Sequence, residues 1–163
     1  MKKVFITITL LLCMQFCFAQ VSYYKGEWTR LNKQELFTGI FKISKNAMNK
    51  LQVEMVWTYL AIDSSNSELM EMYKGKKGRS GIEYAEGNFS ASTNDLSFEG
   101  IRTDDPFVIL GLDKYHLKLS ADNKVIYGST ETQGSNEGLV YAIKLPGAAG
   151  EKEFRAAKAR VKK

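Results

Sequence analysis

The single histidine, His116, is the first side chain to consider for chemistry. It lies on the polar side of an alternating run, and the two cysteines, Cys13 and Cys17, lie near the N-terminus. A typical zinc site needs several histidine and cysteine ligands, and a Ser-His-Asp triad needs its histidine to face a pocket. We therefore expect His116 to be an exposed or rim residue and expect no metal or triad around it.

A cluster of acidic residues is the best candidate for a metal. Asp104 and Asp105 precede Pro106, and Asp113 follows nearby. Carboxylates and loop carbonyls are the ligands that calcium prefers, so these three aspartates form a weak calcium candidate. Asp-Asp-Pro is also typical of a turn, because aspartate accepts hydrogen bonds from backbone amides and proline fixes φ. The turn is the favoured interpretation.

Glu83 and Glu86 could in principle act as a general acid and base. They are three positions apart in an expected strand, and successive strand side chains alternate between faces, so we expect them on opposite faces. The sequence contains no Gly-x-Ser-x-Gly, His-Glu-x-x-His or phosphate-binding glycine motif. These observations predict a protein that is not an enzyme and that needs no cofactor.

Aromatic residues occupy mainly one face of the expected strands. In one interpretation they fill the interior of a small barrel, and this is favoured. In the other, some of them line a cavity, where tyrosine hydroxyls and an indole N–H orient a small amphipathic ligand. The residues predicted to bind that ligand are Trp28, Trp57, Tyr59, Tyr84 and Tyr115.

These residues depend on a series of short strands with period-2 alternation. Polar and glycine-containing turns separate the runs, and no long helical pattern intervenes. The apolar run at 107–112 follows the Asp-Asp-Pro turn and reads as one more run of the same meander. The pattern predicts eight or nine strands, near residues 23–29, 37–44, 51–59, 82–91, 96–100, 107–112, 115–120, 125–132 and 139–145.

The fold class predicted from this pattern is all-β. An eight-stranded up-and-down barrel is favoured because short meander connections suffice for it, whereas Greek keys need longer crossings. A β-sandwich is the alternative. The expected domains are a signal peptide (1–19), one barrel (20–147) and a basic C-terminal tail (148–163).

The start of the first strand carries a resemblance to a known family. Gly26-Glu27-Trp28 followed by an all-β meander resembles the calycin-type barrels, the lipocalin and avidin families, which open with Gly-x-Trp. Asp113-Lys114-Tyr115 is similar to the Thr-Asp-Tyr element of lipocalins, and Lys144 is a candidate for the basic residue that covers their tryptophan. The resemblance implies a barrel closed at one end and open at the other, and it supplies neither a ligand nor a biotin site.

The N-terminus resembles a secretory signal peptide. Lys2-Lys3 precedes a short apolar run that ends near Ala19, and the run is too short for a comfortable membrane span. We expect cleavage after Ala19, leaving a cysteine-free, exported protein in the periplasm or outside the cell. Acylation of Cys13 or Cys17 is the less favoured alternative, and the remaining chain has no transmembrane segment.

Positive charge is concentrated at the two ends of the chain. Residues 20–147 carry 15 basic and 16 acidic residues, which argues against nucleic acid as a partner. The basic loop at 74–79 and the tail at 148–163 could attract an anionic envelope component; a solvated loop and a frayed terminus are the favoured alternative.

The function predicted is an exported, non-enzymatic barrel that binds a small amphipathic ligand or an envelope partner. The alternative is a structural or accessory cell-envelope protein with a filled barrel that acts through its loops and tail.

Overall fold

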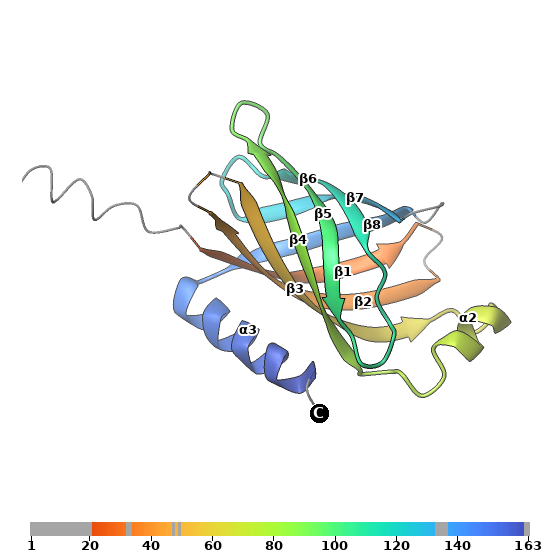
Figure 1. Cartoon of the computed structure of the whole chain (residues 1–163). Coiled ribbons are helices and arrows are strands. Elements are labelled where there is room, and N and C mark those ends of the chain that lie inside the picture. The colour runs from red at the N-terminus through yellow and green to blue at the C-terminus, as the bar shows by residue number, and fades with distance from the viewer. Residues whose placement is uncertain (1–20, 32–33, 47, 49, 133–136, 162–163) are drawn as a thin grey trace, which may run out of the picture.

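The computed structural model describes residues 21–31, 34–46, 48, 50–132 and 137–161. Each strand pairs antiparallel with the next, and β8 pairs with β1, so the sheet closes into an eight-stranded up-and-down barrel (Figure 1). The predicted barrel is confirmed, and closure rather than sandwich packing pairs every strand on both sides. The strands are β1 (Ser22–Arg30), β2 (Glu35–Lys45), β3 (Leu51–Ile62), β4 (Ser80–Ser90), β5 (Asp95–Asp104), β6 (Asp113–Leu119), β7 (Val125–Thr132) and β8 (Glu137–Leu145).

Within the described residues, two helices accompany the barrel. The short α2 (Ser67–Met72) lies in the β3–β4 connection, and α3 (Gly147–Val161) follows β8. Asn66 caps α2 because its side-chain oxygen accepts the N–H of Leu69 at 3.1 Å. Neither helix has the length and apolar content needed to cross a membrane. The predicted signal peptide, residues 1–19, lies outside the described residues.

The apolar run at 107–112 is a loop, so the prediction of a strand there is wrong. The carboxylate of Asp105 accepts backbone N–H groups from Phe107 at 3.2 Å, Ile109 at 2.5 Å and Leu110 at 2.7 Å. Val108 has a left-handed backbone with φ of 51°. The Asp105 side chain thus accepts hydrogen bonds from backbone N–H groups that, in a strand, would donate to neighbouring strands. The segment therefore forms a loop at the end of the barrel.

The barrel interior divides into a solid half and a half with a cavity. At the end where β1 begins and β2 ends, buried apolar side chains pack against one another. At the other end, where β1 ends and β2 begins, aromatic and charged side chains surround an open volume. The buried residues of the solid half include Tyr24, Phe41, Ile43, Leu51, Val53, Met55, Ala85, Leu96, Phe98, Leu117, Ile126 and Ala142.

The C-terminal helix α3 covers part of the outer barrel wall (Figure 1). Phe154, Ala157 and Val161 pack on Tyr23, Ile40, Val56 and Ile82, which project outward from β1 to β4. Their spacing of three and four residues puts them on one helix face. The expectation of a frayed terminus is therefore wrong for residues 147–161, because an apolar patch on the barrel needs this cover.

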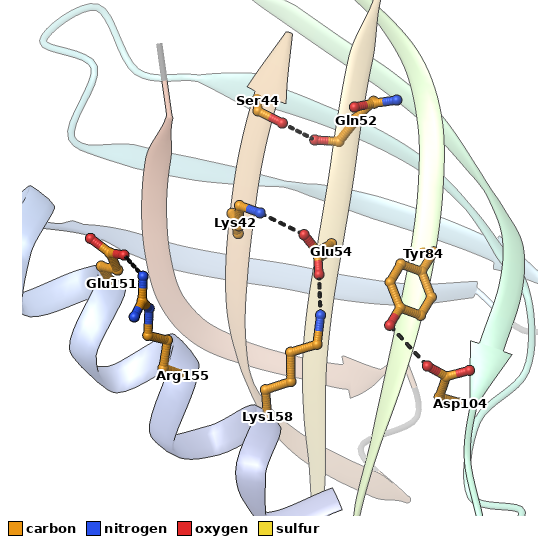
Figure 2. A network of polar contacts seen from close by, with 9 residues as sticks. All are labelled: Lys42, Ser44, Gln52, Glu54, Tyr84, Asp104, Glu151, Arg155 and Lys158. Carbon is orange, nitrogen blue, oxygen red and sulfur yellow. Dashed lines mark hydrogen bonds and ion pairs between the residues drawn. The ribbon is translucent and has the colours of Figure 1, made fainter. Parts of the chain in front are cut away.

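Ion pairs fix α3 against the strands, as Figure 2 shows. Glu54 of β3 accepts from Lys158 of α3 at 2.6 Å and from Lys42 of β2 at 2.6 Å. Burial opposes ionisation of Glu54, yet the hydrogen bonds from these two lysines hold its pKa below the usual value. Lys158 of the basic tail is thus paired with a carboxylate of the barrel.

The outer faces of β7 and β8 carry a row of exposed apolar residues. Tyr127 pairs with Tyr141 across the two strands, and their side chains are 46% and 56% exposed. Leu139 and Ile143 continue the same face of β8 and are exposed as well. Tyr127 and Tyr141 therefore point outward and do not contribute to the barrel interior.

Candidate ligand-binding cavity

A cavity of about 320 Å³ lies inside the barrel at the end formed by the β1–β2, β3–β4 and β5–β6 connections. Strand residues form its floor and walls, while α2 and the loop at 108–111 form its lip. Volumes of this order are typical of small-molecule sites. The lining residues are Trp28, Arg30, Glu35, Phe37, Trp57, Leu69, Met72, Tyr73, Glu83, Val108, Ile109, Leu110, Gly111, Asp113, Tyr115 and Thr132.

Aromatic rings make up much of the wall. Phe37 packs edge-on against Trp28 with ring centroids 5.6 Å apart and contacts Tyr73 at 6.1 Å. Tyr73 in turn stacks on Tyr59 at 4.5 Å. The indole N–H of Trp28 donates to the buried hydroxyl of Thr130 at 2.8 Å, which orients the ring. The wall is therefore both apolar and held in place.

Glu83 is the central polar group of the cavity, and it is only 2% exposed. Its Oε2 accepts from the Tyr115 hydroxyl at 2.5 Å and from the Trp57 indole N–H at 3.3 Å. Its Oε1 accepts the backbone N–H of Asp113 at 3.2 Å. Burial raises the pKa of Glu83 to about 8, and the nearby Asp113 carboxyl adds to the rise. At neutral pH this carboxyl is mostly protonated.

Asp113 is the second carboxyl group, at the start of β6. Burial raises its pKa to about 6, with Glu35 adding to the rise, while a hydrogen bond with Thr132 and the positive charge of Arg30 oppose it. Asp113 and Glu83 thus share one largely desolvated space, and the charge of Asp113 disfavours ionisation of Glu83.

Arg30 and Glu35 form an ion pair at the β1–β2 end of the cavity. Glu35 is 2% exposed, so its charge depends on this partner. Tyr73 also hydrogen-bonds to Glu35, and burial together with that carboxylate raises the pKa of the tyrosine. Arg30 is therefore already neutralised by Glu35 within the cavity.

Glycines on neighbouring strands make room for three side chains of the cavity, Trp57, Trp28 and Glu83. A Cβ on Gly39 would lie 2.4 Å from the Trp57 ring, and one on Gly138 would lie 2.2 Å from Nε1 of Trp28. A Cβ on Gly100 would lie 2.3 Å from Oε1 of Glu83. Each of these contacts is shorter than real Cβ atoms allow, so only glycine permits the observed arrangement.

Three of the five predicted ligand-binding aromatics line the cavity. They are Trp28, Trp57 and Tyr115. Tyr59 is buried behind Tyr73 and does not reach the open volume. Tyr84 lies on the outer wall beside α3, because it alternates with the inward Glu83; its hydroxyl donates to Asp104 at 2.9 Å (Figure 2).

The three aspartates of the weak calcium candidate point to different places. Asp104 pairs with Arg102 at 3.1 Å on the outer surface, Asp105 caps the backbone of its own loop, and Asp113 faces the cavity. Within the described part of the chain, no group of three acidic, histidine or cysteine side chains is placed to hold a metal ion. His116 lies on the outer face, 4.0 Å from Glu131.

The polar residues of the cavity escaped the sequence analysis. Glu83 was considered only as a partner of Glu86, which is exposed on the outer face. The available indication was that Glu83 shares a strand face with Ala85, Gly87 and Phe89, where a carboxyl is out of place. Glu35 likewise shares the face of Phe37. The residues missed are Arg30, Glu35, Phe37, Leu69, Met72, Tyr73, Glu83, Val108, Ile109, Leu110, Gly111 and Thr132.

Lys144, the candidate for the basic residue that covers the tryptophan of lipocalins, does not lie beside Trp28 in this barrel. Lys144 pairs with Tyr24, toward the solid half of the barrel, whereas Trp28 pairs with Val140 at the cavity end. Trp28 accordingly forms part of the cavity wall.

Comparison of the chain with protein families, curated proteins and solved structures found no significant match in any of the three.

Proposed function

We propose that this protein is a non-enzymatic β-barrel that binds a small amphipathic ligand in the cavity. The observation that carries the proposal is the composition of the cavity: aromatic walls surround a few convergent polar groups, Glu83, Asp113 and Tyr115. Small-molecule sites have this combination, in which apolar walls supply binding energy and a few polar groups fix orientation.

The environment of Glu83 supports binding rather than catalysis. In its ionised form the Glu83 carboxyl offers about four acceptor positions, and protein donors occupy three of them. The group is thus held as an anchor with one position left for a ligand. Among the described residues that line the cavity there is no serine, cysteine or histidine to act as a partner in group transfer.

Export to the periplasm or the exterior belongs to the same proposal, on the basis of the N-terminal Lys2-Lys3 and apolar run. A calycin-type relationship is also part of it, supported by Gly26-Glu27-Trp28 at the start of a closed barrel. An exported barrel with one accessible cavity suits capture of a small molecule from dilute surroundings.

Native mass spectrometry tests the proposal. The protein is purified under non-denaturing conditions, and we expect a retained small mass that is lost in the Trp57→Ala variant, which opens the cavity wall. Tyr141→Ala, on the exposed outer face, is the matched control and should keep the mass. Absence of bound mass from the wild type, with no response of tryptophan fluorescence to added small molecules, would contradict the proposal.

A second candidate is the structural or accessory role, and one observation favours it. Four large apolar side chains, Tyr127, Leu139, Tyr141 and Ile143, are exposed together on β7 and β8. Under this alternative, activity of the protein in its own cell depends on that row and is insensitive to substitutions in the cavity. Comparing Tyr141→Ser with Trp57→Ala in a complementation assay separates the two.

A further inference from the structure

The charges inside the cavity are unbalanced. Its lining contains one guanidinium, Arg30, and three carboxyl groups, those of Glu35, Glu83 and Asp113. The guanidinium of Arg30 forms an ion pair with Glu35. No positively charged side chain among the described lining residues is paired with Glu83 or Asp113 as Arg30 is with Glu35, although the charge of Arg30 lowers the pKa of Asp113. Tyr115, Trp57 and a backbone N–H orient the Glu83 carboxyl. Thr132 hydrogen-bonds to Asp113.

Lysine and arginine side chains near the mouth do not correct this imbalance. Lys76 lies at the lip, where it donates to the carbonyl of Val108 at 3.1 Å and lies over the Tyr73 ring. Arg79 stacks over Phe107 with its guanidinium 4.6 Å from the ring centroid. Both belong to the basic loop at 74–79, and neither lines the cavity.

We infer that the ligand of this cavity is an organic cation, a protonated amine carried on a small aromatic or apolar body; the inference rests on the proposed function. An ammonium group has three donors, which suit the free acceptor position of Glu83 together with the Asp113 carboxyl. The electron-rich faces of Trp28, Trp57 and Tyr115 also attract cations.

An anionic ligand would meet the opposite situation. Its charge would be placed beside the Asp113 carboxylate, and beside Glu83 whenever that group is ionised, in a space shielded from water, where like charges repel strongly. A neutral ligand would give neither carboxylate a positive partner. The volume of about 320 Å³ limits the ligand to a compact molecule.

Three probes of similar size test the sign of the ligand charge. They are 2-phenylethylamine, 2-phenylethanol and phenylacetate, which carry an ammonium, a hydroxyl and a carboxylate, respectively, on a short side chain of a phenyl ring. Binding is followed by intrinsic fluorescence, because both tryptophans of the chain, Trp28 and Trp57, line the cavity. We expect the amine to bind at least about tenfold more tightly than the alcohol, as one charge-assisted hydrogen bond allows.

The matched variants are Glu83→Gln and Glu86→Gln, the same substitution on the inner and outer faces of β4. The inner variant should abolish the preference for the amine over the alcohol, and the outer one should keep it. Asp113→Asn provides a second inner variant, expected to weaken amine binding. Equal or tighter binding of the alcohol or the acid, or no binding of the amine, would overturn the inference. The retained mass in native mass spectrometry decides the proposed function separately.

The pH dependence gives an independent readout. Glu83 must be ionised to bind an ammonium, and its pKa of about 8 makes the ionised fraction rise about 50-fold between pH 6 and pH 8. The affinity for the amine should rise by the same factor, with no such rise for the alcohol or for Glu83→Gln. A flat profile for the wild type would contradict the assignment of Glu83. The other titratable or charged groups of the cavity are Arg30, Glu35, Tyr73, Asp113 and Tyr115.

Discussion

Replacing Glu83 with glutamine keeps the shape of the central polar side chain and removes its charge. The glutamine carbonyl oxygen can accept the hydrogen bonds that Tyr115 and Trp57 now donate to Oε2. Its amide group would face the backbone N–H of Asp113, so the 3.2 Å hydrogen bond to Oε1 is lost. We expect that loss to cost about 1 kcal/mol of unfolding free energy at any pH.

The wild-type carboxyl has a much larger, pH-dependent effect. Burial raises its pKa from 4.5 in the unfolded chain to about 8 in the fold. Its contribution is fully favourable below pH 4.5, where both states hold the proton, and is lost as the pH rises toward 8, because only the unfolded state then ionises freely. At 1.36 kcal/mol per pKa unit, the wild type should lose roughly 4 kcal/mol from this group between pH 5 and pH 9.

The assay is urea unfolding followed by tryptophan fluorescence at a series of pH values from 5 to 9. Subtracting the wild-type curve from the Glu83→Gln curve cancels the groups that titrate alike in both proteins. The two proteins should be equally stable within about 1 kcal/mol at pH 5, and the variant should be more stable by roughly 3 kcal/mol at pH 9.

The control is Glu86→Gln, which is exposed on the other face of the same strand and should follow the wild type at every pH. A difference curve for Glu83→Gln that stays flat across the range would refute the reasoning, since it would mean that Glu83 ionises in the fold as easily as in water. A variant less stable than the wild type at pH 9 would refute it as well.

Two substitutions test the supports of the cavity and of α3. Phe154→Ala should lower the unfolding free energy by about 3–5 kcal/mol, because the ring is buried between α3 and the barrel, while exposed Arg155→Ala should change it little, as urea unfolding will show. Gly39→Ala puts a Cβ 2.4 Å from the Trp57 ring, so we expect about 1–3 kcal/mol of destabilisation and a shifted tryptophan emission. Gly147→Ala, with open space around it, should change neither the unfolding free energy nor the emission.

The barrel itself could be predicted from the sequence because it depends on local information. Period-2 alternation in runs such as 37–43 and 51–59 sets the strands, and the short polar turns between most of them favour pairing of strands that follow one another in sequence. The loop at 107–112 has the same apolar composition as a strand. What distinguishes it is the Asp105 carboxylate, which takes three backbone N–H groups that a strand would share with a neighbour.

The docking of α3 depends on information that the tail does not contain. Its apolar positions, Phe154, Ala157 and Val161, are few, and two of them are small or modest in size. They can be buried only after strands β1 to β4 have brought Tyr23 and Ile82 together on the outer wall of the barrel. A tail that reads as basic and polar is therefore ordered by a patch built from distant segments, with Lys158 paired to a strand carboxylate (Figure 2).

The glycines support the proposal that the cavity is a binding site rather than a packing defect. Voids that arise from imperfect packing are lined by apolar atoms and stay dry. Here Gly39, Gly100 and Gly138 lack the Cβ atoms that would displace Trp57, Glu83 and Trp28. An alanine at any of the three would fill space and lose less conformational entropy on folding. Instead, the strands leave room for two indoles and one buried acid at the same end of the barrel. A sequence that keeps an uncompensated carboxyl in an aromatic enclosure gives up stability there, and occupancy of the enclosure by a positively charged ligand is the arrangement that would restore it.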